Sequence, residues 1–239
     1  MSVLSVALIA AVGALAGAAA RPVVFARSVP AAASARSDCP HCGSSVLRRR
    51  LPVLPASGRC PACAQAIGPH AFTPEAAAAV AFAMIAAGGA SGWLAAAQYW
   101  IAACGVALAL IDVAVQRLPD VLTLPALCGT FLLLTAAQLA GEPGSLGRAA
   151  AAAAVLTAVF LLIAFTGAMG VGDVKLAPAI GALLGWSSWT ALFWGAAAGF
   201  VVGAVLEVAR MAVGRARRTH VSFGPYMVIG ALAVSVTAA

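Results

Sequence analysis

The sequence predicts an all-α polytopic membrane protein with about eight transmembrane helices and one small polar insert between the first helix and the second. Two observations predict this fold class. Of the 239 residues, 63% are hydrophobic and only 9% are charged, whereas a soluble domain carries roughly 25% charged residues. The apolar residues also gather into runs of about 20, the length that crosses a bilayer. A soluble globular protein, a disordered chain, a collagen-like repeat and a disulfide-rich secreted fold are therefore excluded.

The apolar runs follow one another along the chain with short connecting loops, except after the first. The predicted runs cover residues 3–20, 75–92, 93–112, 119–140, 148–166, 175–186, 189–209 and 221–238. The sixth run is short, so we expect a tilted or partly re-entrant helix there. The chain thus divides into a first transmembrane helix at 1–20, a polar module at 21–74 and a seven-helix membrane domain at 75–239.

The first run has an alternative interpretation as a cleaved signal peptide, because residues 18–20 are small and resemble a cleavage site. However, residues 1–20 carry no charged side chain, so the basic start of a signal peptide is missing. We therefore interpret this run as a transmembrane helix.

The basic residues predict the orientation of the chain. If the N-terminus lies outside, thirteen of the fourteen Lys and Arg residues face the cytoplasm and only Arg148 faces out. This asymmetry follows the positive-inside rule. The net charge of +7 is thereby explained by membrane topology, and no nucleic-acid partner is predicted.

The polar module contains two Cys-x-x-Cys pairs separated by seventeen residues, formed by Cys39, Cys42, Cys60 and Cys63. This spacing allows two tight turns to close four thiolates around one Zn²⁺ ion. Two disulfides are the main alternative, but the predicted orientation places the module in a reducing compartment. A redox Cys-x-x-Cys is the other, and two copies at metal-site spacing argue against it. Because four thiolates complete the coordination of zinc, the metal would be structural.

Two of the seven acidic residues lie at the predicted cytoplasmic ends of apolar runs. Asp112 ends the third run, and Asp173 follows the fifth in a segment that also contains Gly170, Gly172 and Lys175. Two neighbouring carboxylates share one proton, so one can take a proton from water while the other polarises a carbonyl group. The two glycines would allow an extended substrate backbone to approach closely. The pair therefore predicts a membrane aspartyl protease.

The other acidic residues near the runs have structural interpretations. We expect Asp120 to cap the fourth helix and Glu75 to lie at the interface or cap the second. Glu207 lies three residues before Arg210 and is expected to contact it.

Taken in order, these motifs resemble the bacterial prepilin peptidase family, also called the type IV leader peptidases, which are membrane aspartyl proteases of the GxGD type. The resemblance covers nearly the whole chain. It rests on the paired Cys-x-x-Cys module, Ile111-Asp112, Leu118-Pro119-Asp120, Leu122-Thr123-Leu124-Pro125, the segment 169–176 and Phe223-Gly224-Pro225-Tyr226.

The resemblance implies that Asp112 and Asp173 are the catalytic pair, with Gly170, Gly172 and Lys175 as the supporting motif. It implies a bacterial cytoplasmic membrane enzyme that cuts type IV prepilins and type II secretion pseudopilins between a short basic leader and an apolar helix. Many members also methylate the new N-terminus with S-adenosylmethionine, and the zinc-binding cysteine module accompanies that activity.

Gly58 and Arg59 match a segment that the family links to methyl transfer, but the N-terminal region departs from the family pattern. Residues 21–25 replace an Asn-containing segment, the spacer between the cysteine pairs is shorter, and the aromatic stretch after Pro52-Val53-Leu54 is missing. A peptidase without methyltransferase activity is therefore one alternative. An ion or proton transporter that uses the two aspartates as relay groups is another. Their placement on one side of the membrane disfavours the transporter, because a relay needs access to both faces.

Overall fold

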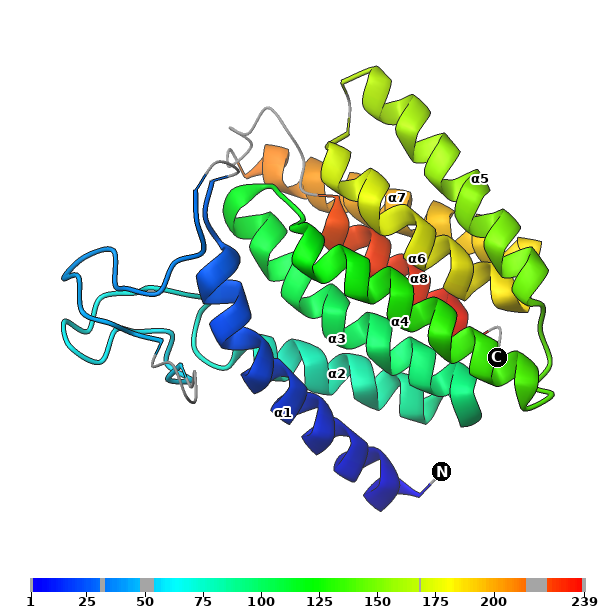
Figure 1. Ribbon diagram of the computed structural model, residues 1–239, viewed down its shortest axis with the longest axis horizontal. Helices are drawn as coiled ribbons and strands as arrows, with labels where there is room; N and C mark the ends of the chain where they lie inside the picture. Colours follow the sequence, from blue (N-terminus) through cyan, green and yellow to red (C-terminus); the bar gives the residue numbers. More distant parts are fainter. Residues whose placement is uncertain (1, 31–32, 48–53, 168, 214–222, 238–239) are drawn as a thin grey trace.

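The computed structural model describes the chain apart from residues 1, 31–32, 48–53, 168, 214–222 and 238–239. The described part is helical, as predicted, and its only extended pairings are two isolated bridges in the polar module. The helices are α1 (Val3–Arg27), α2 (Thr73–Ala87), α3 (Gly92–Val115), α4 (Asp120–Leu139), α5 (Leu146–Phe165), α6 (Val171–Ser187), α7 (Trp189–Ala212) and α8 (Gly224–Thr237). Figure 1 shows them as one bundle with the polar module projecting from one end.

Five of these helices are long and apolar enough to cross a bilayer: α1, α3, α4, α5 and α7. Helices α2 and α8 are apolar but shorter, and α6 has 17 residues. Each predicted apolar run overlaps one of these helices, and the chain is a multi-pass membrane protein. The short α6 is extensively buried and packs against α4, α5, α7 and α8, so its neighbours rather than lipid cover most of its surface.

Helix α1 continues to Arg27, beyond the predicted end of the run at residue 20. The cause is that Arg21 does not face water: its side chain is 1% exposed and donates to Glu75 of α2 at 2.5 and 2.7 Å. A basic residue neutralised in this way does not have to mark the end of a membrane helix.

Small residues bring the helices close together. A Cβ atom on Gly17 of α1 would lie 2.3 Å from the carbonyl oxygen of Pro74 at the start of α2, and one on Gly181 of α6 would lie 2.8 Å from that of Ala152 in α5. Such backbone approach is how helices associate inside a membrane, where the hydrophobic effect supplies no net attraction between them.

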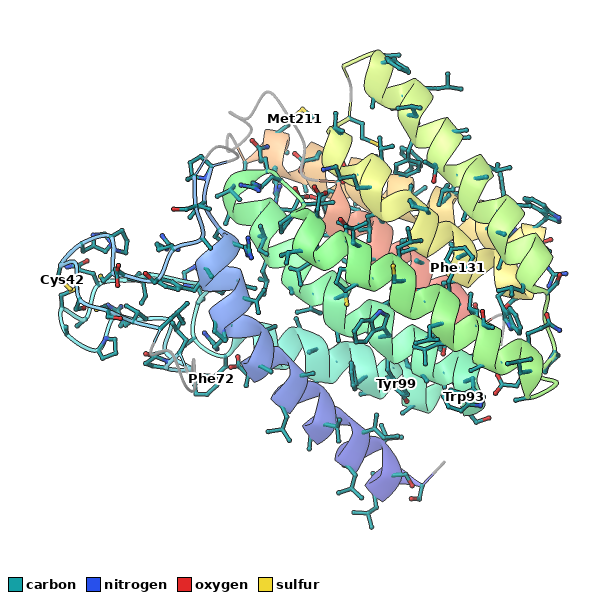
Figure 2. All side chains as sticks on the ribbon, in the orientation of Figure 1. Cys42, Phe72, Trp93, Tyr99, Phe131 and Met211 are labelled. Atoms are coloured by element: carbon teal, nitrogen blue, oxygen red, sulfur yellow. The ribbon has the colours of Figure 1, made fainter. Side chains whose placement is uncertain are left out.

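The described apolar core has two main parts. The larger lies among the helices, and the smaller consists of Phe25 at the end of α1 together with Cys39, Leu54, Cys60 and Ile67 of the polar module. We use the name module end for the end of the bundle that carries this module, the α3–α4 turn and the first turns of α6 and α8. Figure 2 shows Cys42 at the tip of the module and Trp93 at the opposite end of the bundle.

Candidate functional site

Asp112 lies in the last turn of α3, where the helix is about to end. Gln116 adopts a left-handed backbone conformation, with φ of 51°, and closes the helix. Pro119 then precedes α4, and the residue before a proline is disfavoured in helical conformation. The carboxyl group of Asp112 is 5% exposed and accepts a hydrogen bond of 3.2 Å from the backbone N–H of Gly224 at the start of α8.

Asp173 lies in the first turn of α6, which begins after Gly170. Its backbone N–H donates to the Gly170 carbonyl at 3.1 Å. The side chain is 4% exposed, and its Oδ1 atom is buried with no hydrogen-bond partner among the described residues. A negative charge in the first turn is favourable to a helix, but a buried acceptor without a donor is costly. Burial of the Asp173 carboxyl group therefore costs free energy that hydrogen bonds to the described residues do not offset.

The fold brings these two aspartates into one site. Gly172, the residue before Asp173, packs against Leu118, because a Cβ atom added to it would lie 3.2 Å from that side chain. Gly224 packs against both Asp112 and Leu118: a Cβ atom added to it would lie 3.0 Å from Asp112 Oδ2 and 3.5 Å from Leu118 Cδ2. Leu118 thus joins the start of α6 to the start of α8, and the charges of Asp112 and Asp173 act on each other electrostatically. Two buried carboxyl groups in this arrangement can hold one proton between them.

Lys175 does not bind either of these aspartates. Its Nζ atom lies 2.6 Å from Asp120 Oδ1, and the two side chains are 44% and 60% exposed. Asp120 was expected to cap α4, but its side chain makes no capping hydrogen bond there. The pair instead joins the first turn of α6 to the first turn of α4, beside the buried carboxyl groups.

A polar group on α7 and α8 also lies near the aspartates. The Tyr226 hydroxyl donates to Glu207 Oε1 at 3.0 Å, and Arg210 donates to the same oxygen at 2.8 Å. The expected contact between Glu207 and Arg210 is therefore confirmed. Tyr226 was not predicted as a partner. Nothing local in the sequence links it to Glu207, although it belongs to the Phe-Gly-Pro-Tyr segment singled out above.

The four predicted cysteines form a compact cluster in the polar module. Their Sγ atoms all lie within 4.8 Å of one another, with Cys39 and Cys63 at 3.7 Å and Cys42 and Cys60 at 3.8 Å. These distances exclude disulfides, which need about 2.05 Å between the sulfur atoms. Thiolates at about 2.3 Å around a tetrahedral zinc ion are about 3.8 Å apart. The cluster is therefore arranged as a four-thiolate metal site.

The two cysteine pairs lie on similar turns. The N–H of Gly43 donates to the Cys39 carbonyl at 3.0 Å, and the N–H of Ala64 donates to the Cys60 carbonyl at 2.9 Å. Gly43 has a φ of 70° and Ala64 a φ of 58°, so both turns close in the left-handed conformation, which is strained for alanine. The repeated geometry presents four sulfur atoms to one point.

Ser44 is a residue of this cluster that the sequence did not indicate. Its hydroxyl lies 3.1 Å from the Sγ atom of Cys42 and 3.5 Å from that of Cys60. Hydrogen bonds from Ser44 and from the backbone lower the pKa of the Cys60 thiol to about 6, which favours the thiolate form that binds metal.

Gly58 and Arg59 directly precede the second cysteine turn. Gly58 has a φ of 67°, and the Arg59 side chain donates to the Ala64 carbonyl at 2.9 Å. This hydrogen bond of Arg59 therefore stays within the cysteine module, and it does not connect Arg59 to Asp112 or Asp173.

Arg117 joins the module to the segment that carries Asp112. This residue lies in the α3–α4 turn and donates to the carbonyl oxygens of Val29 and Pro30, at 3.0 and 2.8 Å, in the segment that follows α1. The cysteine module and the buried carboxyl groups are therefore held at the same end of the molecule.

Comparison with known proteins identifies similar chains. The model of the type IV leader peptidase family matches residues 99–213, which include both Asp112 and Asp173. The curated relatives that carry the name prepilin leader peptidase/N-methyltransferase include the following three. The one from Burkholderia pseudomallei is 34% identical over an alignment of 212 residues, which covers 83% of this chain and 66% of the relative. Those from Aeromonas hydrophila and Pseudomonas aeruginosa are each 32% identical, over 81% of this chain and 69% and 68% of the relatives.

The chain thus spans about two thirds of the length of the curated relatives it matches. No solved structure matches it.

Proposed function

Because the chain belongs to the type IV leader peptidase family, we propose that it is a membrane aspartic endopeptidase that removes the leader of type IV prepilins and type II secretion pseudopilins. The observation that carries this proposal is the burial of Asp112 and Asp173 beside two glycines that both pack against Leu118. Both residues lie inside the segment that matches the family, and the relatives' printed name supplies the prepilin leader as substrate.

The proposed mechanism uses the two carboxyl groups as a general base and a general acid. The ionised carboxylate takes a proton from a water molecule as its oxygen bonds to the scissile carbonyl carbon, and the protonated partner gives its proton to the carbonyl oxygen. As the tetrahedral diol collapses and the C–N bond breaks, the leaving nitrogen takes a proton from the first carboxyl, and one diol hydroxyl returns its proton to the second carboxylate, which restores the starting protonation of the pair. The Gly224 N–H, which binds Asp112 Oδ2, would hold that carboxyl in position throughout.

The decisive experiment measures cleavage of a cognate prepilin by Asp112→Asn and Asp173→Asn variants. Each should lose at least about 10²–10⁴-fold in rate, because an amide can neither accept nor donate the required proton. Asp38→Asn is the matched control, because Asp38 is an exposed carboxylate of the module that accepts a hydrogen bond from Ser37. The Asp38→Asn variant should cleave the prepilin at the normal rate. Normal cleavage by either of the first two variants would exclude the two-aspartate mechanism, whereas no cleavage by the wild-type chain would favour the transporter alternative.

A methyl-transfer activity is the second candidate, favoured by the relatives' printed name and by the four-cysteine module with which that activity is associated. Gly58 and Arg59 would contribute to it. In the same cleavage assay, labelled S-adenosylmethionine should transfer its methyl group to the cleaved product of the wild-type chain. Cleavage without label would leave a peptidase only, as the N-terminal departures from the family pattern suggest.

We assign the cysteine cluster to one structural Zn²⁺ ion. The sulfur–sulfur distances of 3.7 and 3.8 Å match a tetrahedral thiolate site. Four protein ligands leave no position for a substrate, so the metal would stabilise the module and take no part in peptide cleavage.

We propose that the chain lies in the bacterial cytoplasmic membrane with the module end facing the cytoplasm and the N-terminus outside. The support is the distribution of charge: Arg117 and Lys175 lie at the module end, whereas Arg148 lies at the opposite end with Trp186. With a metal chelator present to release the zinc, a membrane-impermeant thiol reagent should therefore leave the exposed Cys42 unlabelled in intact cells, and label it only after the membrane is opened. Labelling in intact cells would reverse the orientation.

A further inference from the structure

A cavity of about 530 Å³ lies at the module end and is lined by the module, the end of α1 and the last turns of α3. Its wall on the α3 side is apolar and consists of Leu110, Val113, Ala114 and Val115. Val113 is 46% exposed and lies near the end of α3, a helix long and apolar enough to cross a bilayer. The cavity therefore combines an apolar wall from a membrane-length helix with a polar wall from the module.

The wall on the module side carries basic and polar groups. Arg36 lines the cavity with its guanidinium 4.4 Å from the ring centre of Phe25, and it donates to the carbonyl oxygen of Phe25 at 3.0 Å. The two exposed imidazoles of His41 and His70 complete this side.

Two polar atoms in this wall are left without a partner. Arg36 Nε and Ser28 Oγ are buried and make no hydrogen bond within the described residues. Buried polar atoms without a hydrogen-bond partner are rare in native proteins, and a bound ligand is one explanation for them. Both belong to residues that line the same cavity, so one ligand could satisfy both.

The charge of the cavity selects the kind of ligand. Its described lining residues include one permanent cation, Arg36, and no aspartate or glutamate. An anion is therefore favoured. S-adenosylmethionine, with a sulfonium, an ammonium and a single carboxylate, has a net positive charge and would find no acidic partner among these residues.

We propose that this cavity binds an anionic phospholipid from the leaflet at the module end. The phosphate would lie near Arg36 and the two histidines, and an acyl chain would lie along the apolar wall of α3. The Nη2 group of Arg36 already donates to the carbonyl oxygens of Phe25 and Ile67, so its unpaired Nε–H is the donor available for a charge-assisted hydrogen bond to a phosphate oxygen. Basic pockets beside transmembrane helices are known to bind lipid head groups in this way. The site is separate from the two aspartates, and the inference holds whether or not the chain cleaves prepilins.

The test reconstitutes the full chain in nanodiscs of phosphatidylcholine with a minority of phosphatidylglycerol. Native mass spectrometry of the protein released from the nanodiscs then counts the lipid molecules that stay bound to it. The wild-type chain should retain phosphatidylglycerol in preference to phosphatidylcholine. Arg36→Ala should retain about tenfold less, the loss expected for one charge-assisted contact. Arg27→Ala is the matched control, because it removes the same charge from the end of α1 at a residue that does not line the cavity.

A second variant keeps the test decisive if Arg36→Ala fails to fold, as judged by circular dichroism. Ala114→Trp fills the cavity from the α3 side and leaves Arg36 in place, so it too should lose the lipid. Equal loss in Arg27→Ala, or equal retention of both lipids, would overturn the proposal, because general surface charge or simple solvation would then explain the binding. Displacement of the lipid by inorganic phosphate or by S-adenosylmethionine at similar concentration would also overturn it, since the site would then serve a soluble ligand.

Discussion

Gly224 places the start of α8 directly against Asp112. Its N–H donates to Asp112 Oδ2 at 3.2 Å, and an added Cβ atom would lie 3.0 Å from the same oxygen. That separation is tighter than ordinary van der Waals contact, so any larger residue would have to displace the carboxyl group. Glycine thus provides a hydrogen bond and the space for it.

Gly224→Ala should therefore lower the rate of prepilin cleavage by about tenfold, because small misplacements of a reacting group are costly. The backbone N–H is retained, so the midpoint of unfolding should change little. Gly147→Ala is the matched control, since a Cβ atom there would meet only Ser145 Oγ at 3.9 Å. A normal rate for Gly224→Ala would show that the carboxyl group tolerates the shift.

At the scale of helices, α1 and α2 are joined by a buried ion pair as well as by small residues. Arg21 is 1% exposed and Glu75 is 15% exposed, and the guanidinium binds both carboxylate oxygens. Glu75 had been expected to cap α2 or lie at the interface, and Arg21 had been assigned to the polar module. Their pairing keeps α1 helical to Arg27 and determines where the module begins.

Arg21→Ala should reduce the free energy of unfolding by about 2–3 kcal/mol, because it leaves the Glu75 carboxylate partly buried without its partner. The double variant Arg21→Met/Glu75→Gln should recover part of this loss, since no charge is then stranded. Unfolding of the purified protein in mixed micelles measures both effects, with Arg27→Ala as the control. If the single and the double variant were equally stable, the pair would have no energetic role.

At the scale of the whole molecule, the module and the bundle have separate cores. The bundle core shares no residue with the cluster of Phe25, Cys39, Leu54, Cys60 and Ile67. Among the described residues of the module this cluster is small, and a metal would add free energy of folding that burial of these side chains does not supply. Stability of the module should therefore depend on metal, and that of the bundle should not.

The purified chain should hold about one zinc ion, the complement of one tetrahedral four-thiolate site. Cys60→Ser should remove most of the zinc and expose the module to protease, while the helical circular dichroism of the bundle stays unchanged. Cys128→Ser is the control, because Cys128 lies in α4, outside the cluster. Zinc-free protein with a fully protected module would contradict the assignment.

The sequence by itself determined the class of the molecule and the residues worth examining. In a chain with 9% charged residues, each buried charge or cysteine pair requires a reason, so Asp112, Asp173 and the four cysteines were identified without coordinates. The family was also correctly predicted from the order of these motifs.

Only the tertiary structure decided the partners of these residues. Asp112 accepts from a residue 112 positions away, Arg21 binds a carboxylate 54 positions away, and Lys175 binds one 55 positions away. Hydropathy and motif spacing describe each helix separately, whereas these contacts depend on which helix faces are packed together. Close approach at small residues sets that packing, and it brought the two aspartates into one site and left a basic cavity beside the module.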